Sequence, residues 1–157
     1  MGLDQYLHAK KYTSDGDFFG PARKETFTKL RDALGDDAKY VGKMATIPAI
    51  TVDVSVGYWR KANHIHQWFV DTCQDGVDDC RETWVGRERL EQLREVCKQV
   101  LADHSKADEL LPTTSGFFFG STEYDEWYFS DVRDTVDIID NALAMPDDWD
   151  FYYHSSW

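Results

Sequence analysis

The chain has 157 residues, of which 42% are hydrophobic, 15% are aromatic and 29% are charged. This length predicts a single domain with its own core, and the aromatic content argues against intrinsic disorder. No apolar run approaches the roughly 20 residues of a membrane-spanning helix. Residues 1–12 lack the apolar region of a signal peptide, so we expect a cytoplasmic protein with no membrane partner.

The net charge of −12 is concentrated in the last third of the sequence. Residues 107–157 hold twelve Asp or Glu against one cation, Arg133, and so carry −11 of that total. Each contact with a nucleic-acid phosphate needs a cation, so direct binding of nucleic acid is not expected. A basic protein surface is the natural partner of such a segment.

The first half of the chain predicts two strands and one helix. Alternating or β-branched side chains indicate the strands, the second of which is expected to end at Gly57. An apolar face following Pro21 indicates the helix. The ranges are 3–12 and 49–56 for the strands, 21–34 for the helix and 35–48 for an irregular connection.

The second half predicts three segments with helical periodicity. They cover residues 58–73, residues 87–103, and a stretch that starts near Ser121 or Thr122 and stops before Pro146. Two short strands are also predicted: a buried one at 117–119 and a closing one at 149–154. Strands at both ends with helices between them predict an α+β domain over residues 1–157, with a small sheet that includes both terminal strands and about three helices.

Acidic side chains lie along one side of the last predicted helix, opposite its apolar face. Acids three residues apart are about 5 Å apart along the helix axis. Such a row can imitate a phosphate backbone, bind a basic host protein, or simply be solvated. The partner-binding candidates are Glu123, Glu126, Asp131, Asp134, Asp137 and Asp140.

A second candidate site combines the predicted helix 58–73 with the start of the last helix. Aromatic, guanidinium and amide groups on adjacent turns suit stacking on a base and hydrogen bonding to a phosphate. This hypothesis predicts a binder or a small enzyme for a nucleotide-like or phosphorylated small molecule, although Arg60 has the alternative of pairing with an acid of the last helix. The ligand-binding candidates are Trp59, Arg60, Asn63, His66, Ser121 and Thr122.

The sequence contains no metal or catalytic motif. His64 and His66 are two residues apart, so on a helix they point about 200° away from each other and cannot share an ion. No serine or cysteine lies in a nucleophile elbow, and we expect a non-enzymatic protein without a cofactor, although an acid–base pair of carboxylates stays open. The odd number of cysteines predicts free thiols, with a disulfide between Cys73 and Cys80 as the alternative.

Four phrases, MGLDQYL, VGYWRKANHIHQWFV, QDGVDDC and SGFFFGSTEYDEWYF, together resemble a family of small phage- and prophage-encoded proteins. The resemblance covers most of the chain except residues 13–48. It implies expression in the cytoplasm of a bacterial host, and it carries no activity or catalytic residue to transfer. By analogy it favours a protein that binds and inhibits host defence or regulatory machinery. The aromatic-rich segment that ends in Trp157 also admits docking on a second copy of the chain.

Overall fold

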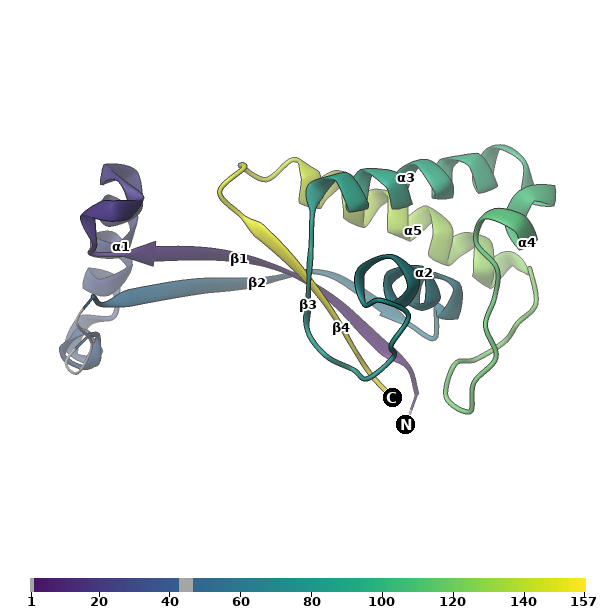
Figure 1. The fold of residues 1–157 in the computed structure, drawn as a ribbon, viewed down its shortest axis with the longest axis horizontal. Helices are drawn as coiled ribbons and strands as arrows, with labels where there is room; N and C mark the ends of the chain where they lie inside the picture. The colour runs from purple at the N-terminus through teal and green to yellow at the C-terminus, as the bar shows by residue number, and fades with distance from the viewer. Residues whose placement is uncertain (1, 43–46) are drawn as a thin grey trace. The chain divides into compact units, whose positions relative to one another are not determined.

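The computed structural model describes residues 2–42 and 47–157. Its sheet has four strands in the order β2-β1-β4-β3 (Figure 1). The prediction of an α+β fold with the N- and C-terminal strands in one sheet is therefore confirmed. The strands are β1 (Asp4–Ser14), β2 (Ala49–Arg60), β3 (Thr83–Val85) and β4 (Asp150–Ser156). The helices are α1 (Pro21–Ala33), α2 (Asn63–Cys73), α3 (Arg87–Ala102), α4 (Ala107–Leu110) and α5 (Glu126–Leu143), with 3-10 turns at Asp17–Phe19, Gly35–Tyr40 and His104–Lys106.

The chain divides into two compact units. The smaller unit is Lys10–Val54, and the larger unit combines Met1–Ala9 with Ser55–Trp157. In the smaller unit, Phe27 is the one hydrophobic side chain among the described residues with no exposed surface, and Phe18 is 91% exposed. The larger unit contains the main core and the pockets described below.

The core of the larger unit lies between the sheet and the helices α2, α3 and α5. Phe69 on α2 stacks on Tyr153 of β4, with their ring centroids 4.0 Å apart. Helices α3 and α5 run alongside each other (Figure 1). Apolar side chains at helical spacing on these helices are completely buried, which explains why they pack on the sheet. They include Ile65, Leu90, Leu93, Cys97, Val100, Val132 and Ile139.

The predicted boundary between the second strand and the next helix is wrong. Strand β2 continues through Gly57 to Arg60, and α2 begins only at Asn63. Gly57 and Trp59 are buried whereas Tyr58 and Arg60 are exposed, which is the alternation of a strand. A Cβ atom on Gly57 would lie 2.6 Å from Cγ2 of Ile138 on α5. The glycine therefore permits the close approach of a helix and does not end the strand.

Two predictions before α5 are also wrong. Residues 117–119 form a turn and not a buried strand, with Phe117 96% exposed. Helix α5 begins at Glu126 and not near Ser121, because the carboxylate of Asp125 accepts hydrogen bonds from two backbone N–H groups of the first turn. No helix among the described residues has the length and apolar character needed to cross a bilayer.

Candidate functional site

The end of β2 is fixed against α5 by a buried side-chain hydrogen bond. The indole N–H of Trp59 donates to Oγ1 of Thr135, at 2.8 Å. Thr135 lies one turn after Asp131 on α5, so this bond places the residues that follow Trp59 beside that stretch of the helix. Trp59 is 3% exposed. Its ring therefore supports the site from inside the core and is not available to contact a ligand.

Asn63, the first residue of α2, holds the loop before α5 in place. Its Nδ2 donates to the carbonyl oxygens of Phe119, at 3.0 Å, and Ser121, at 2.8 Å. Its Oδ1 accepts from the backbone N–H of Thr114, at 2.9 Å. The amide is thus engaged with the backbone on both sides, and its role is to shape the pocket.

The end of β2, the start of α2, the loop before α5 and the first turns of α5 enclose a pocket of about 210 Å³, which we call the Asp131 pocket. Its cationic side chains lie at the end of β2 and directly after it. Its carboxylates belong to α5 and to the loop before α5, and two aromatic rings come from the first turn of α5. The charged and aromatic residues that line it are Arg60, Lys61, His64, Glu123, Asp125, Trp127, Tyr128 and Asp131.

Asp131 is a half-buried carboxylate with no hydrogen bond or ion pair to its side chain among the described residues. Burial raises its pKa to about 6, and repulsion from the charges of Asp134 and Asp125 adds to the increase. A carboxyl group with such a raised pKa in a pocket is a candidate for a binding site.

Neither cationic side chain of the pocket forms an ion pair with the pocket's carboxylates among the described residues. Nη1 of Arg60 lies 3.9 Å from Oδ1 of Asp4 on β1, and the guanidinium pairs with no acid of α5. Lys61 is exposed and has no ion pair among the described residues. Lys61 has a left-handed φ of 61° and lies next to Gly120, whose φ of 87° is left-handed as well. The pocket therefore carries both signs of charge.

His64 is 3% exposed, although its place opposite the apolar positions of the predicted helix 58–73 predicts an outward-facing side chain. Its ring packs on Tyr128 of α5, with centroids 4.2 Å apart, and α5 therefore covers the side that the pattern leaves to solvent. Burial lowers the pKa of His64 to about 3, so the imidazole is neutral near pH 7. Its buried Nε2 has no hydrogen-bond partner among the described residues.

His66 is completely buried and faces away from this pocket. Its Nδ1 lies 2.7 Å from the hydroxyl of Tyr153, and its Nε2 lies 2.9 Å from Oδ2 of Asp78. The Tyr153 hydroxyl also donates to Oε1 of Gln5 on β1, at 3.2 Å. This enclosed network joins α2 to β1, β4 and the segment before β3.

The structure thus brings together part of each predicted set. The predicted ligand residues Arg60, Asn63 and Ser121 line the Asp131 pocket, and so do the predicted partner residues Glu123 and Asp131. Trp59, His66 and Thr122 are not part of its lining. The sequence pattern did not single out Lys61, His64 or Trp127 for this site. For Trp127 a signal was available, since the ring follows the helix cap directly and lies off the apolar face.

We define the acidic face as Glu123, Glu126, Asp131, Asp134, Asp137 and Asp140. Two of its members have basic neighbours. Asp140 pairs with Arg94 of α3, at 2.8 Å, and Glu126 pairs with Arg133 of α5, at 2.7 Å. Asp134 and Asp137 are exposed and have no ion pair among the described residues. The negative charges of these two side chains on the acidic face are therefore not neutralised by an ion pair within the described part of the chain.

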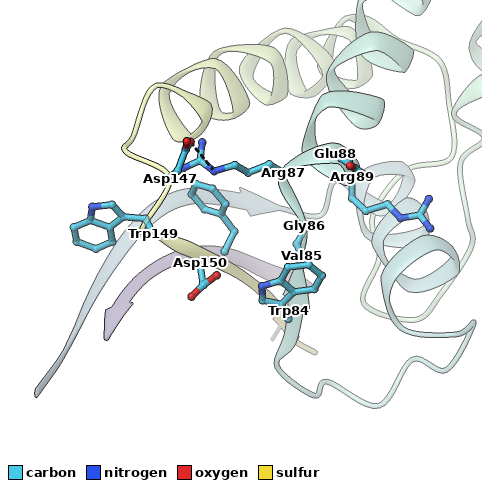
Figure 2. A pocket seen from close by; sticks show the side chains of 10 residues that line it. Trp84, Val85, Gly86, Arg87, Glu88, Arg89, Asp147, Trp149 and Asp150 are labelled. Atoms are coloured by element: carbon cyan, nitrogen blue, oxygen red, sulfur yellow. Dashed lines mark ion pairs between the residues drawn. The ribbon is translucent and has the colours of Figure 1, made fainter. Parts of the chain in front are cut away.

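A larger pocket of about 440 Å³ lies between the start of α3 and the start of β4. Figure 2 shows Trp84 and Trp149 at its two ends, with Arg87 pointing toward Asp147, whose carboxylate lies 3.8 Å from Nε. The guanidinium also lies over the ring of Phe151, 5.2 Å from its centroid. It donates to the last carbonyls of α5 and the turn after it, those of Leu143, Met145 and Pro146. Arg87 is therefore a helix cap that anchors α5.

No group of three or more His, Cys, Asp or Glu side chains within residues 2–42 and 47–157 could hold a metal ion. Cys73, Cys80 and Cys97 are free thiols, and burial raises the pKa of Cys97 to about 12. No protein-family model, curated protein or solved structure shows a significant similarity to the chain.

Proposed function

We propose that this chain is a non-enzymatic binding protein whose acidic face holds a basic surface of a partner protein. The observation that carries the proposal is the state of Asp134 and Asp137. Both carboxylates are exposed on successive turns of α5, and neither forms an ion pair among the described residues. Cations of a partner would relieve the repulsion between such neighbouring charges and accelerate association.

Two further observations support a protein partner. Burial raises the pKa of Asp131 at the inner edge of the face, and repulsion from the charges of Asp134 and Asp125 adds to the increase. Trp127, on the first turn of α5, is 80% exposed. An indole ring among carboxylates suits an arginine or lysine side chain, which gains from the ring face and the charge together. Tryptophan is also enriched among the residues that dominate binding at protein interfaces.

The partner that we propose is a protein of the bacterial host, because the chain resembles phage- and prophage-encoded proteins. A host protein that binds nucleic acid offers a basic surface that fits the row of carboxylates. In that case Asp131, Asp134 and Asp137, at three-residue steps, stand in for phosphates. Inhibition of host defence or regulatory machinery would follow from occupation of that surface.

Charge reversal on α5 tests the proposal. The full chain and its Asp134→Lys/Asp137→Lys variant are used to capture proteins from host lysate at low and high salt. The matched control is Asp36→Lys/Asp37→Lys, which makes the same change in net charge at exposed positions of the smaller unit. We expect a partner that is retained by the control, lost by the α5 variant and weakened by salt. Equal capture by both variants, or no partner at either salt concentration, would refute the proposal.

A further inference from the structure

The Asp131 pocket has two walls of opposite charge that do not neutralise each other. Arg60 and Lys61 supply the cationic wall, and Glu123, Asp125 and Asp131 supply the acidic one. No ion pair joins the two walls among the described residues. Charges of both signs that do not pair with each other across a small recess match a ligand that also carries both signs.

The inner wall has an unused polar atom. Nε2 of His64 is buried without a hydrogen-bond partner among the described residues, and a neutral imidazole accepts or donates there according to its tautomer. Buried polar atoms without a partner are rare in folded proteins. The neighbouring hydroxyl of Tyr128 is already engaged, because it donates to the carbonyl of Leu111, at 2.8 Å. His64 therefore favours a ligand that brings a polar group to Nε2.

The outer wall offers an aromatic surface. Trp127 is 80% exposed, and its ring has no aromatic or cationic neighbour among the described residues. A planar cation that leaves the pocket along α5 would meet this ring and the carboxylate of Glu123. Both interactions favour positive charge at the pocket mouth.

We propose that the Asp131 pocket binds a free basic α-amino acid. Its carboxylate lies at Arg60 and Lys61, its ammonium group lies at Asp131, and its cationic side chain extends over Trp127. The charges are complementary, because a basic amino acid offers a carboxylate to the cationic wall and two cationic groups to the acidic wall. This site goes beyond the proposed protein interface and does not depend on it.

The size and charge of the pocket decide against the predicted nucleotide-like ligand. Its volume of about 210 Å³ is below the roughly 300–1,000 Å³ of pockets that enclose drug-sized molecules. The three carboxylates would also repel the phosphates of a nucleotide. A single amino acid satisfies both conditions.

Calorimetric titration of the full chain with L-arginine tests the proposal. Agmatine is the same molecule without the carboxylate, and L-norleucine keeps the amino-acid group with an uncharged side chain. We expect L-arginine to bind and both analogues to bind about tenfold or more weakly, because each loses one charge-assisted contact. No binding of L-arginine, or agmatine binding equally well, would overturn the proposal.

Three variants test whether L-arginine binds in the Asp131 pocket. Asp131→Asn and Trp127→Ala are expected to weaken L-arginine binding about tenfold or more, because they remove the ammonium partner and the aromatic surface. Asp137→Asn removes a charge from the same helix outside the pocket, and its dissociation constant should stay within about twofold of the wild type. Trp127 is exposed, so that variant reports on binding even where Asp131→Asn disturbs the fold. Unchanged binding by Trp127→Ala would show that the ligand sits elsewhere.

Discussion

The hydroxyl of Tyr153 lies 2.7 Å from Nδ1 of His66 and 3.2 Å from Oε1 of Gln5, and so connects β4 to α2 and β1 inside the larger unit. Burial raises the pKa of this tyrosine well above its ordinary value, so the hydroxyl keeps its single proton. Its removal leaves two buried polar groups without a partner, each of which costs about 1–3 kcal/mol.

We therefore predict that Tyr153→Phe lowers the free energy of unfolding by about 2–4 kcal/mol. Urea unfolding followed by circular dichroism measures the change. Tyr40→Phe serves as the control, since Tyr40 is 67% exposed, and it should change stability by less than about 0.5 kcal/mol. A similar small change for Tyr153→Phe would mean that the buried network contributes little.

Periodicity and composition predicted the fold class because α2, α3 and α5 are amphipathic and both terminal strands alternate. They failed where long-range contacts decide the structure. Gly57 has the local features of a strand end, yet the approach of Ile138 from α5 makes it an interior position. His64 lies on the polar side of its helix in the sequence, and only the packing of Tyr128 buries it. The sequence placed Arg60, Asn63 and Ser121 in one candidate site, and they line the Asp131 pocket. It did not add Lys61 or Asp131 to that site, because only long-range packing brings these segments together.

The first turn of α5 depends on a single cap. Oδ1 of Asp125 accepts from the backbone N–H groups of Trp127, at 3.0 Å, and Tyr128, at 3.1 Å. Loss of such a cap costs about 1 kcal/mol, and asparagine is an equally good cap. We predict that Asp125→Ala lowers the free energy of unfolding by about 1 kcal/mol whereas Asp125→Asn retains it. Equal urea midpoints for the alanine variant and the wild type would contradict the prediction.

Asp131 makes stability depend on pH in a defined direction. Its pKa in the folded chain is about 6, against about 4 in an unfolded chain. Between these values the folded state binds more protons than the unfolded state, so this group's contribution to stability is present at low pH and is lost as the pH rises through about 6. The charged or titratable groups that face it are Asp134, Asp125, Glu123 and Tyr128, with Arg60, Lys61 and His64 on the opposite walls.

Asp131→Asn removes this ionisation and keeps the shape of the side chain. We predict that the variant is more stable than the wild type above about pH 7, by on the order of 1 kcal/mol after allowance for solvent screening of a partly exposed group. The difference should vanish at about pH 4, where the wild-type carboxyl is protonated in the folded state. His64, whose lowered pKa destabilises the fold toward low pH, acts on both chains and cancels from the comparison. Urea unfolding of the two proteins at several pH values measures the difference, and a gap that stays constant with pH would show that Asp131 is not held at a raised pKa.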